Sequence, residues 1–347
     1  MILGETGVFF ANRRILRFAT AFFLFVLFAQ PLSAMQKKTR PHSLGVRTVE
    51  YFDVSRNRPL LVEIWYPTTK QKPLDTPVDE MWIHPQEVRN APFIKEMRKA
   101  PLLLISHGYK GGRRDISWLA DIMVQAGYIV AAVDHYGDTR CYFDPRQSVC
   151  FWNRPLDCMF LLNQLSRDER MREKIDFDRI GFIGYSLGGM TGLALAGGQA
   201  KDLSCVIKSL SDHKIEPKHF EGFDFSIAEK SYKESRVKAM LLLCPAFFIY
   251  GADSFKQIQI PIGLVAAMGD EVLPFREHAY QVIQHLSPIK LKLFREEISH
   301  YAFMNRVSES GKKILKKALH TDPPCCERLI LHQEVGEFAV DFFRSAL

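Results

Sequence analysis

One pentapeptide constrains this chain more than any other feature: Gly184-Tyr185-Ser186-Leu187-Gly188, which has the pattern G-x-S-x-G. Residues 180–183 before it are apolar, as in a short buried strand, and residues 190–196 after it are rich in small side chains, as in a helix. A serine at so sharp a turn from strand to helix has strained backbone, so the positions two before and two after it must be nearly free of side chain. The two glycines meet this requirement, which predicts Ser186 as a nucleophile.

A nucleophilic serine needs a base, and the base needs an acid that orients it. In proteins with this turn the acid and then a histidine follow the serine along the chain, each after a strand. Residues 258–268 contain an apolar strand, and the loop after it predicts Asp270 as the acid, with Glu271 as the neighbouring alternative. Residues 289–294 alternate apolar and charged side chains as a strand does, and His300 after them is predicted as the base.

The negative charge that forms on the substrate oxygen needs backbone N–H donors, one of them from the loop after an early strand. Residues 101–106 read as that strand, so the N–H groups of Tyr109 and Leu187 are the expected donors. His107 and His135 lie at strand ends and are expected to shape loops, not to transfer protons. Most other histidines, His332 among them, lie in helical or polar stretches and are predicted at the surface.

Further segments join the nucleophile turn in carrying a resemblance to a known family: residues 58–67, 106–108, 127–135, 154–157 and 236–239. With them the chain resembles the α/β-hydrolase superfamily. More narrowly, it is similar to bacterial relatives of platelet-activating factor acetylhydrolase and dienelactone hydrolase. The resemblance covers about residues 44–347.

This resemblance implies hydrolysis of lipid or phospholipid esters with short acyl chains, with no metal and no organic cofactor. Dienelactone hydrolase itself uses a cysteine nucleophile where this chain has Ser186, so lactone chemistry is less expected than ester hydrolysis. A polyester or cutin-type hydrolase, a thioesterase and a peptidase stay open as alternatives, because the same residues transfer acyl groups to water. A non-catalytic binding protein of this fold would be expected to lose one of the three catalytic residues, and all three are present.

The pattern of apolar residues predicts an α/β fold. Residues 46–53 and 60–66 read as an antiparallel strand pair, and residues 68–98 as an irregular surface excursion. From residue 101 onward strands alternate with helices, which is typical of a mostly parallel sheet covered by helices on both faces. The charged residues 199–236 interrupt this alternation and are predicted as a cap insertion near the active site, with a solvated excursion that touches no substrate as the alternative.

The start of the chain reads as an export signal. Arg13, Arg14 and Arg17 precede an apolar run of about a dozen residues, too short to cross a bilayer comfortably, and Ala34 offers a small residue at a cleavage point. We therefore predict residues 1–34 as a signal peptide, with an uncleaved membrane anchor as the alternative. The hydrolase domain is predicted over residues 35–347, exported to the periplasm or secreted.

The charge distribution argues against nucleic acid as a partner. The formal net charge is +7 at pH 7, but the basic residues form no stripe and no nucleic-acid-binding motif accompanies them. The expected partner is a small-molecule ester or lipid, with weak contact to anionic membrane surfaces as a further expectation. The oligomeric state stays open.

The chain has seven cysteines, which fits an exported protein. Cys141 and Cys150 flank a short loop and are predicted to form a disulfide. Cys158 and Cys244 fall on apolar helix and strand patterns and are predicted as buried thiols.

Overall fold

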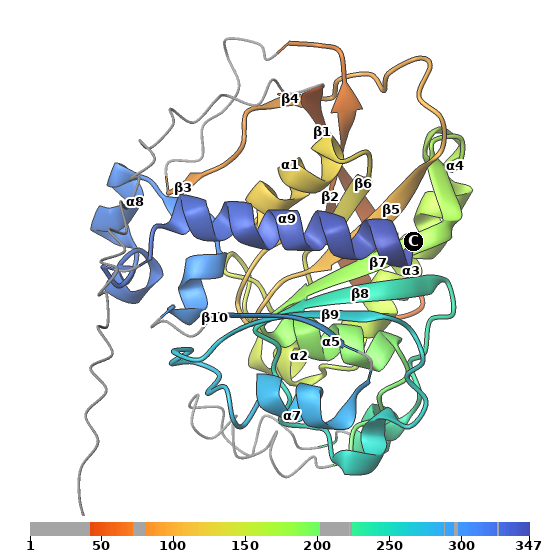
Figure 1. Ribbon diagram of the computed structural model, residues 1–347. Helices are drawn as coiled ribbons and strands as arrows, with labels where there is room; N and C mark the ends of the chain where they lie inside the picture. The colour runs from red at the N-terminus through yellow and green to blue at the C-terminus, as the bar shows by residue number, and fades with distance from the viewer. Residues whose placement is uncertain are drawn as a thin grey trace, which may run out of the picture. The chain divides into compact units, whose positions relative to one another are not determined.

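A nine-stranded sheet forms the centre of the part of the chain that the computed structural model describes (Figure 1). That part comprises residues 42–71, 81–201, 222, 224–287, 289–294, 298–324 and 326–347. The strands of the described part, in both the nine-stranded sheet and a separate two-stranded sheet of β3 and β11, are β1 (Ser43–Asp53), β2 (Arg58–Thr68), β3 (Trp82–Ile83), β4 (Glu87–Arg89), β5 (Ala100–Ser106), β6 (Ile129–Val133), β7 (Ile175–Tyr185), β8 (Val237–Leu243), β9 (Ile262–Ala267), β10 (Ile289–Phe294) and β11 (Arg306–Val307).

The helices of the described part connect these strands. The α-helices are α1 (Ser117–Gln125), α2 (Pro145–Val149), α3 (Asn153–Arg167), α4 (Glu169–Arg172), α5 (Leu187–Leu195), α7 (Ala279–His285), α8 (Glu309–Ile314) and α9 (Arg328–Ala346). Short 3₁₀ helices are η2 (Phe225–Glu229), η3 (Ala252–Phe255), η4 (His300–Phe303) and η5 (Lys317–Leu319).

The large sheet has the strand order β10-β9-β8-β7-β5-β6-β2-β1-β4. Every neighbouring pair from β10 to β6 is parallel, whereas β2 pairs antiparallel with both β6 and β1. The central strands β6 and β9 are buried along their whole length and read as continuous apolar runs, as expected of strands covered on both faces. The edge strand β10 instead exposes Lys290, and such charges oppose pairing with another chain.

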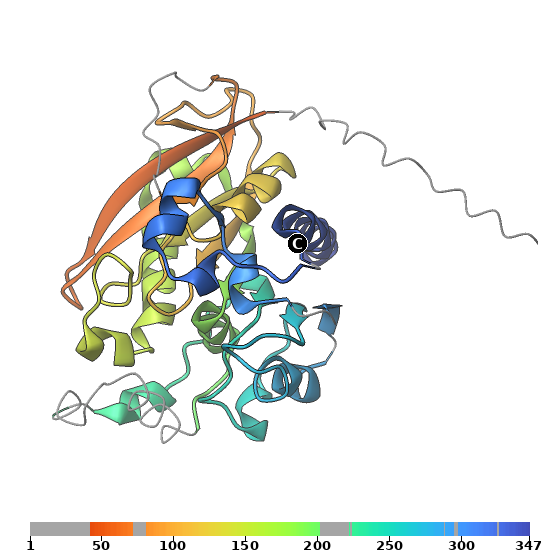
Figure 2. The ribbon, with the colours of Figure 1, turned by 90° about the vertical axis from the view of Figure 1, so that its left-hand side faces the viewer.

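Helices cover both faces of the sheet. Helices α1 and α9 pack on one face around Leu119, Val335 and Phe343, and α9 is seen nearly end-on in Figure 2. Helices α3 and α5 pack on the opposite face around Leu162 and Leu193. This arrangement confirms the predicted α/β layering and leaves the carboxyl ends of the parallel strands, with the loops that follow them, as the place for a site.

Most predicted elements are confirmed, including the strand pair β1–β2 and the alternation of strands and helices from residue 101 onward. The prediction for residues 68–98 as a surface excursion is wrong in one respect, because β4 within it pairs in parallel with β1. Val88 of β4 is buried, and the strand covers an edge of the sheet that would otherwise be open.

Two predicted segments lie mainly outside the described residues. Residues 1–34, predicted as the leader, are not described, and of residues 199–236 the structure describes 199–201, 222 and 224–236. In the latter part Ala228 and Tyr232 are buried against the main core. Within the described residues no helix has both the length and the apolar character to cross a membrane.

The predicted disulfide between Cys141 and Cys150 is wrong for this structure, in which both residues are free thiols. Cys141 is exposed, whereas Cys150 is buried and donates from Sγ to the carbonyl of Arg146 at 3.2 Å. The thiol of Cys150 is therefore hydrogen-bonded within its own short helical segment. Cys158 and Cys244 are buried, as predicted.

The thiols should differ in reactivity. Alkylation by iodoacetamide requires the thiolate. Burial raises the pKa of Cys150 to about 11 and also raises the pKa of Cys158, so these two should be alkylated only after denaturation. Exposed Cys141 should react in the folded protein. Peptide mapping by mass spectrometry checks this, and a linked Cys141–Cys150 peptide would contradict it.

Candidate active site

Ser186 occupies the turn between β7 and α5 with φ 56° and ψ −119°. A non-glycine residue in this region is strained and persists only where surrounding contacts hold it. Its N–H donates to the carbonyl of Leu243 at 2.9 Å, and its carbonyl accepts from the N–H groups of Gly189 at 2.9 Å and Ala246 at 3.0 Å. The end of β8 and the loop after it therefore fix the strained turn.

The two glycines of the turn are required by close backbone approach. A Cβ on Gly184 would collide with the carbonyl of Gly188, and a Cβ on Gly188 would collide with the carbonyl of Ser106 at the end of β5. The turn thus brings β7, α5 and β5 closer together than side chains would allow. The sequence pattern predicted that both positions must lack a side chain. The structure adds that at Gly188 the obstacle is the neighbouring strand β5.

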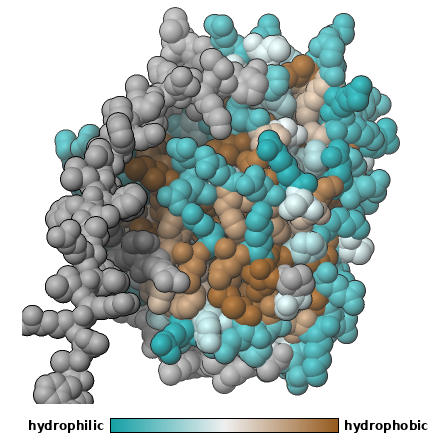
Figure 3. Space-filling model, viewed as in Figure 1, coloured by the Kyte–Doolittle hydropathy of each residue, from teal (hydrophilic) through white to brown (hydrophobic). Residues whose placement is uncertain are grey.

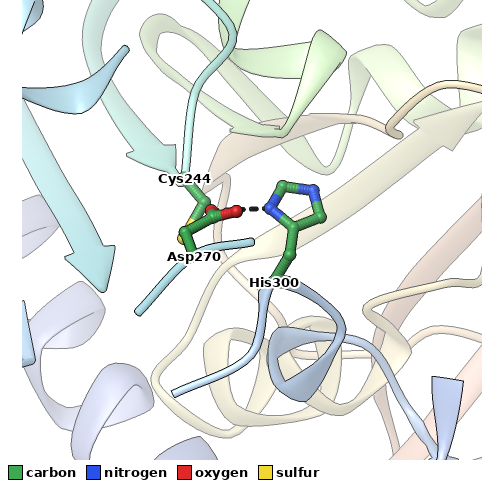
Figure 4. Close-up of side chains that lie close together, drawn as sticks. All are labelled: Cys244, Asp270 and His300. Atoms are coloured by element: carbon green, nitrogen blue, oxygen red, sulfur yellow. Dashed lines mark hydrogen bonds and ion pairs between the residues drawn. The ribbon is translucent and has the colours of Figure 1, made fainter. Parts of the chain in front are cut away.

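Asp270 and His300 face each other from the loops after β9 and β10 (Figure 4). Oδ2 of Asp270 lies 2.7 Å from Nδ1 of His300. The other carboxylate oxygen accepts from the N–H groups of Val272 at 3.0 Å and Leu273 at 2.7 Å. Because backbone donors fix one oxygen, the other is aimed at Nδ1, which holds the imidazole proton there and leaves Nε2 as the proton acceptor.

Glu271, the alternative acid, binds the backbone of the histidine loop and not the imidazole. Its Oε2 accepts from the N–H of His300 at 3.0 Å, and its Oε1 accepts from the hydroxyl of Ser299 at 2.9 Å. Tyr185 supports the same loop from below, since its hydroxyl donates to the carbonyl of His300 at 3.0 Å. Its ring also stacks on the imidazole with 5.1 Å between centroids. The structure therefore places Asp270 on the ring and Glu271 on the main chain.

Cys244 is the third side chain in Figure 4, and sequence reasoning treated it only as a buried thiol. It follows β8 directly, and its Sγ lies within 4.8 Å of the carboxylate of Asp270 and the imidazole of His300. Burial and the neighbouring Asp270 carboxylate raise the pKa of Cys244 well above its usual range, so the thiol is neutral. Its position directly after a buried strand was the available sequence signal.

The side chains of Cys244, Asp270 and His300 offer metal-ligand atoms within 4.8 Å of one another, a grouping found among the described residues. The carboxylate and imidazole atoms that a metal ion would have to bind are, however, joined to each other by the 2.7 Å hydrogen bond. With Nδ1 of His300 bonded to Asp270, the imidazole is arranged to accept a proton at Nε2 and not to bind a metal ion.

The loop after β5 reaches Ser186. A Cβ on Gly108 would stand 3.0 Å from Cβ and 3.4 Å from Oγ of Ser186, so this loop is in backbone contact with the serine. Tyr109, the predicted donor of this loop, comes next in the chain. Leu187, the second predicted donor, is the first residue of α5, where backbone N–H groups lack an intrahelical partner. Both predicted donors thus belong to segments that border Ser186.

The remaining histidine predictions have mixed outcomes. His107 and His135 are buried behind the loop after β5, where they shape it as expected. The prediction of His332 at the surface is wrong, because it lies on the inward side of α9. Its ring stacks on Trp118 at 4.0 Å between centroids, and Nε2 bonds the carbonyl of Ala302 at 3.0 Å. Burial lowers the pKa of His332 to about 3, so it is neutral.

No protein-family model matches the chain, and no curated protein matches it. Among solved structures the chain is similar to a ferulic acid esterase from Streptomyces cinnamoneus, with a TM-score of 0.59 and 20% identity. The match covers 89% of this chain and 91% of that one. A likeness at this identity speaks to architecture alone. Together with the mostly parallel sheet between two helical layers, it shows that the chain has the α/β-hydrolase fold.

Proposed function

We propose that this protein is a serine hydrolase that cleaves carboxylic esters. One observation carries the proposal: Ser186 sits on a strained turn at the same edge of the sheet as the hydrogen-bonded pair Asp270–His300. A nucleophile, a base and an acid that orients the base are the parts that acyl transfer requires. The architectural likeness to an esterase agrees with this chemistry.

In the proposed reaction Oγ of Ser186 attacks the ester carbonyl while Nε2 of His300 takes the hydroxyl proton. Asp270 stabilises the resulting imidazolium through its 2.7 Å hydrogen bond to Nδ1. The N–H groups of Tyr109 and Leu187 stabilise the oxyanion. When the tetrahedral intermediate collapses, the alcohol leaves with the proton from His300. Water then attacks the acyl-enzyme by the same steps, releasing the acid and restoring Ser186.

We further propose a lipid or phospholipid ester with a short acyl chain as the substrate class, as the resemblance implies. The ring of Tyr301 stands edge-on to His300 at 5.6 Å between centroids, which adds bulk beside the base. Polyester, cutin-type and thioester substrates remain alternatives that the catalytic residues do not distinguish.

Exposed apolar side chains bear on the proposed weak contact with membranes. In Figure 3 hydrophobic side chains gather on the face below α9. Among the described residues near β9 and β10, Met268 is 52% exposed and Leu291 is 42% exposed. Apolar side chains close to the loop of Asp270 would favour approach to a lipid surface. We therefore propose that the enzyme meets its substrate at or near membranes. Its export is proposed separately, from the leader that the sequence predicts over residues 1–34.

Replacement of the nucleophile tests the function directly. Ser186→Ala should reduce turnover of p-nitrophenyl acetate by about a million-fold, the scale seen when a serine nucleophile is removed. The fold should survive, because the small side chain is removed without disturbing the backbone hydrogen bonds. A fluorophosphonate probe should label the parent protein and not the variant. Turnover near the parental value would refute the serine-hydrolase proposal.

The two adjacent acids should differ sharply. Asp270→Asn should lower kcat by about ten-thousand-fold, because the amide favours the wrong imidazole tautomer. Glu271→Gln keeps an acceptor for the backbone of the histidine loop and should cost less than about tenfold, the scale of one weakened hydrogen bond. Steady-state kinetics of both variants, with circular dichroism as the folding control, checks the ranking. The reverse order would move the acid to Glu271.

Acyl-chain length tests the substrate class. Each methylene that enters an apolar pocket contributes about 0.8 kcal/mol, so a long chain should be preferred wherever the pocket accepts it. For the proposed short-chain enzyme, kcat/KM across p-nitrophenyl esters should peak between acetate and butyrate. A peak at laurate or longer would contradict the short-chain proposal and favour a lipase that acts on long acyl chains.

A further inference from the structure

We propose that Arg154 is a positioning residue that orients the oxyanion-hole N–H of Tyr109. This inference rests on the proposed hydrolase function and assigns a role that the catalytic residues alone do not reveal. Arg154 is the second residue of α3 and is only 2% exposed, as is Asp138, its ion-pair partner. A buried charge of this kind is costly unless fully paired, so its contacts identify what it does.

The guanidinium bonds two successive carbonyls of the oxyanion loop. Nη1 donates to the carbonyl of His107 at 2.8 Å, and Nη2 donates to the carbonyl of Gly108 at 3.1 Å. Asp138 fixes the other side, since its Oδ2 accepts from Nη2 at 2.8 Å and from Nε at 3.2 Å. A planar guanidinium held by a carboxylate presents its remaining N–H groups in fixed directions. Arg154 therefore helps to fix the orientation of both carbonyls, that of Gly108 together with the N–H of Gly111, which donates to it at 3.2 Å.

Orientation of the second carbonyl determines the direction of the donor. The carbonyl of Gly108 and the N–H of Tyr109 belong to one planar trans peptide, in which the two groups point in opposite directions. Because Arg154 binds the carbonyl oxygen of Gly108, the N–H of Tyr109 points away from the guanidinium. The positive charge on the oxygen side also polarises the peptide, which strengthens its N–H as a donor. Gly108 in turn is in contact with Ser186, so this peptide borders the reacting atoms.

Neighbouring side chains also hold this loop, but they do not replace the hydrogen bonds from Arg154. His107 Nε2 accepts from the N–H of His135 at 3.1 Å, so Nδ1 carries the proton and donates it to the carbonyl of Gly108 at 2.7 Å. His135 is anchored in turn by Asp157 at 3.0 Å and by Ser106 Oγ at 2.9 Å. This second serine–histidine–aspartate set is fully buried, so it braces the loop and cannot meet a substrate. Only the guanidinium of Arg154 bonds both loop carbonyls among these side chains.

The inference predicts a selective effect on turnover. Arg154→Gln should lower kcat by about 10- to 100-fold, somewhat less than outright removal of an oxyanion donor. KM should change less than about twofold, because the oxyanion exists only in the transition state. The inhibition constant of an alkyl trifluoromethyl ketone, whose adduct with the serine carries an oxyanion, should rise by the same factor as kcat falls. Arg154→Lys, which keeps the charge, should recover part of the loss.

Arg328 provides a matched control. It is also buried and also paired with an aspartate, Asp322, at 2.6 Å. Like Arg154 it donates to two loop carbonyls, those of Asn305 and Leu319, both at 3.2 Å. Arg328→Gln should therefore lower the melting temperature about as much as Arg154→Gln but leave kcat and the ketone inhibition constant near the parental values. The comparison separates orientation of the donor from general destabilisation.

Each outcome decides the question. Parental kcat and ketone affinity in Arg154→Gln, or an equal loss in Arg328→Gln, would overturn the positioning role while the hydrolase function stands. If Arg154→Gln fails to fold, Asp138→Asn loosens the same guanidinium and must show the same selective loss of kcat for the inference to survive. A parent protein that neither hydrolyses p-nitrophenyl esters nor reacts with a fluorophosphonate would instead refute the proposed function itself.

Discussion

The strained backbone of Ser186 is the constraint on which the rest of the site depends. A serine with φ 56° is held there by hydrogen bonds to Leu243, Gly189 and Ala246, which belong to the neighbouring strand, the helix and the next loop. Such strain costs on the order of 1–3 kcal/mol and is stable only inside a structure that over-determines it. The parallel strands β7 and β8 supply that structure, because their register places the carbonyl of Leu243 opposite the serine N–H.

The same edge of the sheet assembles the other parts. Strands β5, β7, β8, β9 and β10 are parallel, so all of them deliver their following loops to one side. Those loops carry the Gly108–Tyr109 peptide, Ser186, Cys244, Asp270 and His300. Each side chain is then fixed by local bonds, as Asp270 is by two backbone N–H groups. The parallel sheet thus converts positions far apart in sequence into one constellation.

Behind the site lies a buried polar network that does not touch the reacting atoms. Arg154 with Asp138, and Arg58 with Asp157 and His135, are nearly inaccessible to solvent. Desolvation of such groups offsets much of their mutual attraction, so they contribute little net stability compared with a packed apolar core. These ion pairs instead fix the orientation of the groups they bind, because charged and bidentate hydrogen bonds restrict the angles between donor and acceptor. An oxyanion hole built from backbone needs this kind of angular control.

Short-range sequence signals were enough to locate the strained turn at Ser186, the strands that lead to Asp270 and His300, and the layered fold. Each depends on a local pattern: glycines around a serine, an apolar run, or alternation of apolar and charged residues. Several other features could not be read in this way: the thiol of Cys244 against Asp270, the hold of Arg154 on the oxyanion loop, the pairing of β4 with β1, the free Cys150 and the burial of His332. Each depends on which distant segments pack together. Local patterns specify backbone conformation, whereas the partner of a buried polar side chain is decided only when the strands and helices have met.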